Sequence, residues 1–338
     1  MKVAVCQKPY EIRVEDLDRP VVASNEALLR IRRIGICGSD LHAFRGEQPY
    51  FTYPRILGHE LAGMIESAPL GDHGLRKGDP VAVVPYLECG RCIACRAGKT
   101  NCCVALNVLG VHSDGGMKEY ISIPADHLVR ADGLDWDQIA LVECLAIGAH
   151  AVRRANIHPS EYALVIGTGP IGMGVLQFAR VAGARLIAMD ISDCRLEFCK
   201  TELGIDQTIP AGDNVVAELK KITRGDFPTV VFDATGSVES MGRALGYLSH
   251  GGRLIYVGLV KGDISINDPE FHKRETTLLA SRNATREDFV RVIEALQAGE
   301  VTTSGFVTHR APLEALEEHF ESWARPGSGV IKAMVEAG

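Results

Sequence analysis

Apolar and polar residues alternate in two different ways along the chain, and the change comes near residue 162. Before it, short apolar runs are broken by Gly, Pro and Asp, a pattern typical of strands joined by turns. The predicted strands lie at residues 3–8, 26–36, 61–67, 79–85 and 117–124. The first part of the chain is therefore predicted to be a β-rich domain.

From residue 162 onward, strand patterns alternate with helical patterns. Strands are predicted at residues 162–167, 184–190, 229–236 and 253–259, and helices at 169–184, 192–204 and 237–252. Strands and helices that alternate at this spacing indicate a doubly wound parallel sheet. Two helices, near residues 286–298 and 312–323, and a strand at 329–337 follow without that rhythm. We expect this last part to pack back on the first.

The expected fold is therefore α/β, with a nucleotide-binding domain inserted into a split catalytic domain. At roughly 150 residues per domain, the 338 residues suggest about two domains. The predicted boundaries are 1–147 for the catalytic domain, 148–285 for the parallel-sheet domain and 286–338 for the part that returns to the catalytic domain.

Charge and hydropathy exclude several classes of protein. The chain has 36 Lys and Arg against 43 Asp and Glu, a net charge of −7. Nucleic-acid binding depends on clustered cations, so this balance argues against a nucleic-acid partner. No apolar run reaches about 18 residues, and the N-terminus becomes charged too early for a signal peptide. We therefore expect a cytoplasmic protein with no membrane segment.

A glycine-rich turn follows the first strand of the predicted parallel sheet. Gly167, Gly169 and Gly172 have the spacing that permits a tight turn, close approach of amides to a pyrophosphate, and packing of a helix on a strand. Asp190, at the end of the next strand, suits the ribose diol of NAD and would repel the 2′-phosphate of NADP. Arg195 could stack on adenine or admit a phosphate, and beside Asp190 we assign it to the adenine side.

Five of the ten cysteines fall between residues 89 and 103. In a cytosolic chain, such a cluster indicates a metal more often than disulfides. Four thiolates suit a closed structural zinc site, and the predicted ligands are Cys89, Cys92, Cys95 and Cys103. Cys102 is an alternative fourth ligand. Buried reduced cysteines and a nucleic-acid-binding zinc module are the competing interpretations, and the acidic charge balance opposes the second.

A second set of ligand-type residues is dispersed along the chain. Cys37 lies on a glycine-lined turn, and His59 and Glu60 are adjacent. Glu143 and Cys144 come just before the nucleotide domain. A thiolate, an imidazole and a carboxylate with one open position describe a catalytic zinc site. Each residue alone has a structural explanation, as a core or helix-surface residue, but the combination with the cysteine cluster and the nucleotide turn favours catalysis.

Six segments are specific enough to indicate a family. They are GICGSDLH (35–42), GHE (58–60), CGRCIACRAGKTNCC (89–103), GVHSDGGMKEY (110–120), VECLAIGAHAVRR (142–154) and GTGPIG (167–172). With them, the chain resembles the zinc-dependent medium-chain alcohol and polyol dehydrogenases over its whole length. Glu143 stands where the alcohol dehydrogenases carry a cysteine, so the sorbitol, threonine and sugar-acid dehydrogenases are more similar.

The resemblance implies a GroES-like catalytic domain with an inserted Rossmann domain, and it implies roles for individual residues. Cys37, His59 and Glu60 would hold a catalytic zinc, with Glu143 binding it directly or through water. Ser39 and His42 would relay the alcohol proton to solvent, and Ser39 and Glu143 would contact the substrate. The residues expected to contact NAD are Gly167, Gly169, Ile171, Gly172, Asp190, Arg195, Val257, Gly258, Leu259, Ser281, Arg282 and Asn283.

The substrate class is inferred from shorter segments. Residues 44–46, 53–55 and 281–283 are most similar to those of the L-galactonate and L-gulonate 5-dehydrogenases, which implies oxidation of a sugar acid. Cys144 and Ala43 stand where the polyol enzymes usually have a proline and often a tyrosine, which weakens the case for a sorbitol-like pocket. A polyol or L-threonine substrate is the alternative. A buried substrate carboxylate needs a cationic partner, and Arg45 and Arg282 are the candidates.

Two other functions share this fold, a metal-free quinone reductase and a non-catalytic binding protein. Cys37, His59 and Glu60 oppose the first, while Ser39 and Asp190 oppose the second. The expected cofactors are therefore NAD and two zinc ions, one catalytic and one structural. The expected partners are a small polyhydroxy acid or polyol as substrate and further copies of the chain, as a homotetramer or homodimer.

Overall fold

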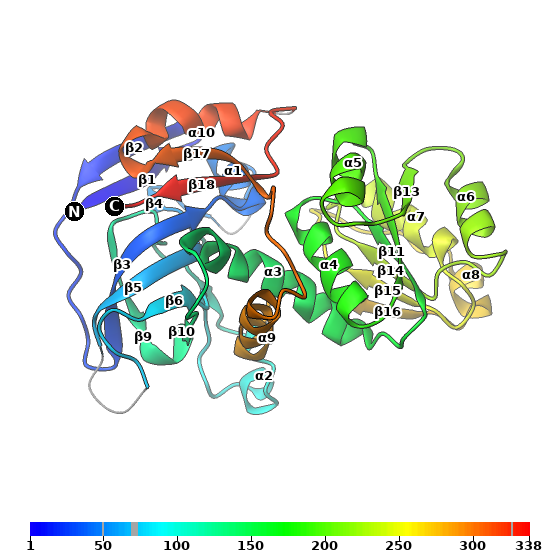
Figure 1. Ribbon diagram of the computed structural model, residues 1–338, viewed down its shortest axis with the longest axis horizontal. Helices are drawn as coiled ribbons and strands as arrows, with labels where there is room; N and C mark the ends of the chain where they lie inside the picture. The colour runs from blue at the N-terminus through cyan, green and yellow to red at the C-terminus, as the bar shows by residue number, and fades with distance from the viewer. Residues whose placement is uncertain (49–50, 69–73, 326) are drawn as a thin grey trace. The chain divides into compact units, whose positions relative to one another are not determined.

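The computed structural model describes residues 1–48, 51–68, 74–325 and 327–338. The chain divides into two compact units. Unit 1 comprises Met1–Cys144, Ala284–Gly299 and Thr303–Gly338, and unit 2 comprises Leu145–Asn283 and Glu300–Thr302. Unit 1 is thus built from both ends of the chain, and both termini lie beside its sheets (Figure 1).

Unit 1 is organised around a seven-stranded sheet. Its strands are β3 (Glu26–Gly35), β5 (Glu60–Ser67), β6 (Pro80–Val83), β9 (Tyr120–Pro124), β10 (Leu128–Arg130), β17 (Val307–Pro312) and β18 (Lys332–Glu336). Their order is β10-β6-β5-β3-β18-β17, and β9 pairs with β3. Gly35 at the end of β3 lies opposite Glu60 of β5 and Met334 of β18. This register brings three distant parts of the chain together near Cys37.

Shorter elements complete unit 1. They are β1 (Lys2–Lys8), β2 (Glu11–Asp16), β4 (Arg55–Ile56), β7 (Tyr86–Leu87), β8 (Asn107–Val108), α1 (Gly38–Phe44), α2 (Ile93–Arg96), α9 (Arg286–Gln297) and α10 (Leu316–Ala324). Three 3-10 turns, η1 (Thr100–Cys102), η2 (Ala125–His127) and η4 (Leu313–Ala315), join them. Apolar side chains such as Ile31, Leu61 and Phe320 form one core under the sheets, so the site residues stand on a packed base.

Unit 2 is a six-stranded parallel sheet flanked by helices (Figure 1). The strands are β11 (Tyr162–Ile166), β12 (Arg185–Asp190), β13 (Gln207–Pro210), β14 (Val230–Asp233), β15 (Arg253–Tyr256) and β16 (Thr277–Ala280). The helices are α4 (Pro170–Val181), α5 (Asp193–Thr201), α6 (Val215–Ile222), α7 (Val238–Arg243) with the 3-10 turn η3 (Ala244–Tyr247), and α8 (Asp268–Lys273).

The strand order in unit 2 is β13-β12-β11-β14-β15-β16. This is the order of a doubly wound sheet, whose topology reverses between β11 and β14. Ligands of such sheets bind beyond the carboxyl ends of the strands at that point. The predicted fold class is therefore confirmed, and the topology marks the ends of β11, β12 and β14 as the place to look for a ligand site.

Several elements differ from the sequence-based expectation. Helix α3 (Trp136–Ala155) was not predicted, because apolar residues occupy nearly every position between Ile139 and Val152 and leave no amphipathic period. The helix predicted at 237–252 ends as α7 and η3, in a segment that contains Gly242 and Gly246, and glycine lowers helix propensity. Helices α6 and α8 and strands β13, β16 and β17 were also not predicted.

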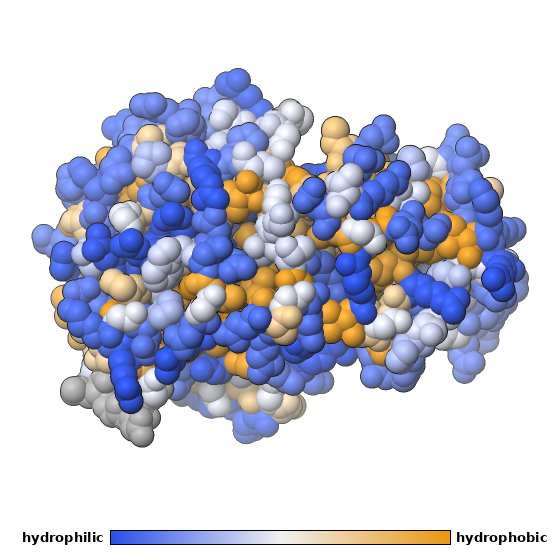
Figure 2. Space-filling model, viewed as in Figure 1, coloured by the Kyte–Doolittle hydropathy of each residue, from blue (hydrophilic) through white to orange (hydrophobic). Residues whose placement is uncertain are grey.

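Hydrophilic residues cover much of the molecular face drawn in Figure 2, and apolar residues show between them. Some apolar side chains are strongly exposed, among them Val21 at 94% and Ile191 at 90%. Single exposed apolar residues are ordinary for a folded chain. Among the described helices, none combines the length and the apolar character needed to cross a membrane.

Candidate functional site

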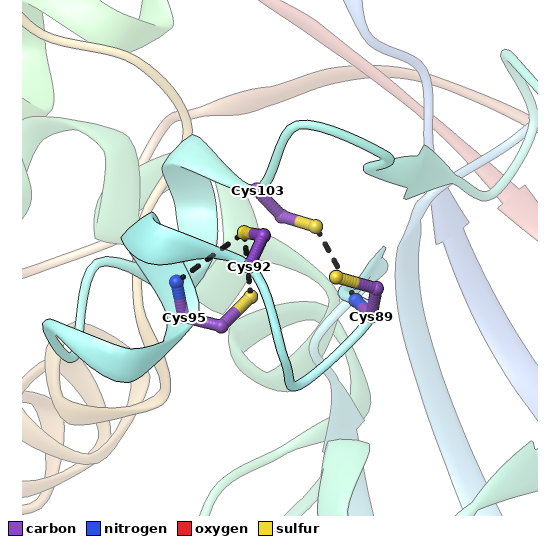
Figure 3. Close-up of side chains that lie close together, drawn as sticks. All are labelled: Cys89, Cys92, Cys95 and Cys103. Carbon is purple, nitrogen blue, oxygen red and sulfur yellow. Dashed lines mark hydrogen bonds between the residues drawn. The ribbon is translucent and has the colours of Figure 1, made fainter.

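Four cysteines converge in unit 1 around helix α2 (Figure 3). The Sγ atoms of Cys89, Cys92, Cys95 and Cys103 all lie within 4.8 Å of one another. Backbone amides point at these sulfurs: Cys95 N–H donates to Cys92 at 3.5 Å, and Cys89 N–H donates to Cys103 at 3.3 Å. Cys102 is exposed and lies outside the group. The donor set fits a closed tetrahedral zinc site, and it is the set expected from the sequence.

The surroundings of the cluster shift the thiol pKa values of Cys92 and Cys95 in opposite directions. Backbone hydrogen bonds, chiefly from the amide of Cys95, lower the pKa of Cys92 to about 6. Burial raises the pKa of Cys95 to about 12. One thiolate is therefore available at neutral pH, whereas another thiol must lose its proton as the metal binds. Among the described residues, no other group of three or more His, Cys, Asp or Glu is as compact.

A buried aspartate joins the turn that carries Cys37 to the segment that carries His59. Asp40, in the first turn of α1, accepts hydrogen bonds from Cys37 N–H at 2.9 Å and from Gly58 N–H at 3.2 Å. Its Oδ1 lies 3.9 Å from His59 Nδ1. Sequence analysis missed Asp40, although an acidic residue three positions after a helix cap is a recognisable capping signal.

His59 is buried among groups that carry or develop negative charge. Burial lowers the pKa of His59, but Cys37 and Asp40 outweigh burial, so the pKa lies well above its usual value. His59 Nδ1 has no hydrogen-bond partner among the described residues. A buried imidazole whose neighbours are a thiol and carboxyl groups, and whose surroundings favour a cation, fits a catalytic zinc site better than an apolar core.

Glu143 and Cys144 are neighbours on α3 with different surroundings. The Tyr86 hydroxyl donates a hydrogen bond to Glu143 Oε1, and burial raises the pKa of Glu143. Cys144 is 1% exposed, and burial raises the pKa of its thiol well above the usual value. Tyr86 was missed from the sequence because it lies 57 residues from its partner. Glu143 has the polar environment of a ligand, whereas Cys144 packs as a small apolar group.

Glu60, expected to bind the catalytic zinc, is held by a buried lysine. Its two carboxylate oxygens accept from Lys332 Nζ at 2.6 and 2.7 Å, and this Nζ also donates to Ile36 O at 3.1 Å. A Cβ on Gly35 would lie 2.1 Å from Glu60 Oε2, so only glycine leaves room for the carboxylate. Zinc ligation by Glu60 stays a prediction, and it requires the carboxylate to leave this ion pair.

Ser39 and His42 lie three residues apart on α1, a spacing that places them on one side of a helix. The side chain of His42 is 56% exposed, and its Nδ1 lies 2.9 Å from Glu47 Oε2. Arg45 donates to Glu47 Oε2 and to Ala324 O, both at 3.0 Å. Arg45 therefore has structural partners within unit 1, and its binding of a substrate carboxylate would have to replace them.

The glycine-rich turn of unit 2 has the geometry that its spacing predicts. Gly167 has a φ of +85°, and Gly169 is the N-cap of α4. A Cβ on Gly172 would lie 1.9 Å from the carbonyl oxygen of Gly167, so a larger residue would force helix and strand apart. The N–H groups at the start of α4 favour an anion at this end of the helix.

A cavity of about 430 Å³ opens beside this turn, where the doubly wound topology predicts a ligand. Gly167, Gly169, Asp190 and Arg195 line it, together with residues that the sequence analysis did not assign, including Thr235, Ser240 and Tyr247. The signal for Thr235 was available in the strand end FDATG at 232–236, which carries a glycine turn of its own. Polar and charged groups on a concave wall fit a nucleotide.

The other residues expected to contact NAD also lie in unit 2 but outside the lining of this cavity. Ile171 is in the first turn of α4, Val257, Gly258 and Leu259 follow β15, and Ser281, Arg282 and Asn283 follow β16. Within the described chain, the Ser281 hydroxyl and the Asn283 Nδ2 are buried without a hydrogen-bond partner. These two groups are thus open to a ligand, and their cofactor role stays a prediction.

Comparison with known sequences supports the resemblance to the zinc-dependent dehydrogenases along nearly the whole chain. The alcohol dehydrogenase GroES-like domain model matches residues 23–133, and the zinc-binding dehydrogenase model matches residues 170–298. L-galactonate-5-dehydrogenase of Escherichia coli K12 is 42% identical over 99% of this chain and 98% of its own length. Sorbitol dehydrogenase of Bacillus subtilis 168 is 31% identical over 99% of this chain and 97% of its own length.

Solved structures agree as well. RspB of Escherichia coli CFT073, complexed with NADH, superposes with a TM-score of 0.92 at 28% identity, covering 99% of both chains. A zinc-binding dehydrogenase of Sinorhizobium meliloti 1021, bound to NADP, superposes with a TM-score of 0.91 at 26% identity, covering 99% of this chain and 98% of its own. The expected cofactors, zinc and a nicotinamide dinucleotide, are those of these proteins' family.

Two family models, near full-length similarity to sugar-acid and polyol dehydrogenases, and a four-cysteine cluster suited to zinc support the same identification. The resemblance inferred from sequence is confirmed. The chain belongs to the zinc-type medium-chain alcohol dehydrogenase family.

Proposed function

We propose that the chain is an NAD- and zinc-dependent dehydrogenase that oxidises a secondary alcohol of a sugar acid, such as L-galactonate or L-gulonate, to the ketone. The reaction type is supported by one observation above the others: Cys37 and Glu143 lie close enough to the buried His59 to raise its pKa, and Asp40 accepts hydrogen bonds from the backbone at Cys37 and Gly58. The substrate class is supported by the 42% identity to an L-galactonate-5-dehydrogenase.

The residues of unit 1 would bind the metal and move the proton. When bound, zinc supplies Lewis acidity toward an alcohol and NAD supplies the hydride acceptor. The metal would be held by Cys37, His59 and Glu143. Asp40 fixes the relative position of two of these ligands, because it accepts a hydrogen bond from Cys37 N–H and lies 3.9 Å from His59 Nδ1. Ser39 would accept a hydrogen bond from the substrate hydroxyl and, as it takes that proton, would release its own hydroxyl proton through the nicotinamide ribose toward His42. His42, exposed one helical turn further on, would pass that proton to solvent.

The residues of unit 2 would orient the cofactor. The start of α4 would bind the pyrophosphate, and Asp190 would accept hydrogen bonds from the adenosine ribose diol. A 2′-phosphate would bring its negative charge against that carboxylate, so NAD would bind in preference to NADP. Arg195, on the same cavity wall, would pack on the adenine side.

Oxidation of a neutral polyol is the second candidate. It is favoured by the similarity to a sorbitol dehydrogenase and by the structural partners of Arg45, which leave that guanidinium less available to a substrate carboxylate. If the substrate is an aldonate and Arg45 keeps these partners, Arg282 is the remaining candidate for recognition of the substrate carboxylate.

One assay tests the proposal and separates its two substrate classes. Zinc-loaded protein is supplied with NAD or NADP and with L-galactonate, L-gulonate or sorbitol, and formation of the reduced cofactor is followed. We expect turnover of an aldonate with NAD, and a folded but inactive Cys37→Ser variant. Preference for sorbitol would move the chain to the polyol enzymes. Absence of turnover across the panel, or equal use of NADP, would contradict the proposal.

We also propose that the enzyme works in the cytoplasm as a homodimer or homotetramer. The location is supported by the ten cysteines, all of which are free thiols in the structure, because disulfides are rare in reducing compartments. The association is supported by strand β16, which forms one edge of the parallel sheet of unit 2.

A further inference from the structure

Thr168 lies between the first two glycines of the nucleotide turn and has no role in the mechanism above. Its side chain is fully buried, at 0% exposure. Its main-chain N–H donates to Asp190 Oδ2 at 2.6 Å, and its hydroxyl donates to the same oxygen at 2.9 Å. The N–H of Ser192 donates to the other oxygen, Oδ1, at 2.9 Å. Three donors therefore hold the carboxylate in one orientation.

The distribution of these donors leaves one oxygen open. A carboxylate has about four acceptor sites, two on each oxygen. Thr168 fills both sites of Asp190 Oδ2, whereas Ser192 fills one site of Oδ1. Asp190 lines the cavity, so the remaining site of Oδ1 is the one available to a ligand hydroxyl. The main-chain N–H of Thr168 is directed to Asp190, so the anion-binding N–H groups must be those further along the turn and α4.

We infer that Thr168 is the positioning residue for cofactor selectivity: its hydroxyl orients Asp190 so that one carboxylate oxygen meets the ribose diol of NAD. This inference rests on the proposed use of NAD. Thr168 belongs to the glycine-rich turn. Its two hydrogen bonds therefore connect the Asp190 carboxylate, which would bind the ribose, to the backbone turn that would bind the pyrophosphate. Loss of the hydroxyl frees Oδ2 from one of its two donors, and the carboxylate can then rotate away from the diol.

The neighbouring strand offers a matched control. Thr235 donates to Asp233 Oδ1 from its N–H at 2.9 Å and from its hydroxyl at 2.6 Å, the same pair of bonds as at Thr168. Asp233 is fully buried and is not part of the cavity lining. Thr235 itself lines the cavity, so Thr235→Val removes an equivalent bond at the same cavity wall, but from a carboxylate that is not part of the lining. Any effect of this substitution on the wall acts on NAD and NADP alike.

Calorimetric titration of zinc-loaded protein with NAD and with NADP, without substrate, tests the inference. A hydrogen bond to a charged group corresponds to roughly a tenfold change in affinity or more. We expect Thr168→Val to weaken NAD binding about tenfold and NADP binding by less than about twofold. The ratio of the affinity for NAD to the affinity for NADP should therefore fall at least about fivefold. Thr168→Ser keeps the hydroxyl and should keep the selectivity. Thr235→Val should change both affinities by the same factor.

Two further comparisons separate positioning from damage to the turn. In an Asp190→Asn background, Thr168→Val should change selectivity little, because the carboxylate through which it acts is gone. Equal losses of NAD and NADP affinity in Thr168→Val would overturn the inference while leaving the proposed function intact. A wild-type protein that binds neither dinucleotide, or both equally, would overturn both. Should Thr168→Val fail to fold, as judged by its melting curve, Thr168→Ala provides the same comparison.

Discussion

Two adjacent residues of α3, Glu143 and Cys144, differ by about 100° in direction around the helix axis. Glu143 accepts a hydrogen bond from Tyr86, whereas Cys144 is packed in the core. We expect Glu143→Ala to weaken binding of the catalytic zinc by at least about tenfold, and Cys144→Ala to retain it. Zinc content by elemental analysis distinguishes the variants. A Cys144→Ala protein that loses one zinc would reverse the assignment.

Lys332 and Glu60 form the most deeply buried ion pair described in unit 1, with side-chain exposures of 3% and 0%. Removal of one partner leaves a buried charge without compensation. We expect Lys332→Met to lower the free energy of unfolding by about 3–5 kcal/mol in denaturant titration, and Glu60→Gln in the same chain to recover part of that loss.

The exposed pair of Lys77 and Glu66, 3.2 Å apart, provides the control. Lys77 keeps 72% of its side chain exposed, so Lys77→Met should change the stability by less than about 1 kcal/mol. If Lys332→Met and Lys77→Met lowered the free energy of unfolding equally, burial would not be the reason that the pair of Lys332 and Glu60 stabilises the fold.

Only some residues of the candidate site could be predicted from the sequence. The four cysteines of the compact cluster could be predicted because their spacing and residue type carry the signal themselves. Cys37 and His59 were assigned only in combination with other motifs and from the family resemblance, and their metal role stays a prediction. Tyr86 and Lys332 could not be predicted, since each acts on a partner 57 or 272 residues away. Asp40 carried a local capping signal, but nothing local indicated its bond with Gly58, 18 residues away. A lone lysine in the apolar strand KAMVE is a hint of a buried charge, but nothing local identifies Glu60 as its partner.

At the scale of elements, the segment around α2 depends on metal more than on packing. Helix α2 has four residues, none of them buried, so apolar contacts contribute little to its stability. Zinc binding to four thiolates supplies folding free energy directly.

We therefore expect Cys95→Ser to reduce bound zinc from about two ions per chain to about one and to lower the melting temperature. Cys102→Ser, in the same segment but with its thiol exposed, is the matched control and should keep both ions. If the two substitutions had the same effect, the structural site would need a different set of ligands.

Elements could be predicted where the pattern was periodic and local. The alternation in β11, β12, β14 and β15 predicted the parallel sheet, because buried strands between amphipathic helices are distinctive. Helix α3 has no polar stripe, and β17 was missed because its pairing with β18 depends on a partner beyond an intervening helix. Short elements such as β13, with four residues, carry too few positions to show a period.

At the scale of the whole molecule, strand β16 bears on association. It ends the strand order of the sheet, so one of its edges pairs with no described strand. Its residues are exposed or partly exposed, and Leu278 is 36% exposed. Open strand edges pair readily with a second copy. We expect Leu278→Lys to shift the protein toward monomer in sedimentation analysis, and Val216→Lys, at a position 42% exposed on α6, to leave association unchanged.

An open edge also makes thermal stability depend on how much protein is present. If β16 of one copy pairs with β16 of another, association acts on the folded state alone and stabilises it by mass action. The melting temperature should then rise as the protein is concentrated, and dilution should lower it. The melting temperature of Leu278→Lys should be the same at every protein concentration, because this variant does not associate and association therefore cannot stabilise its folded state.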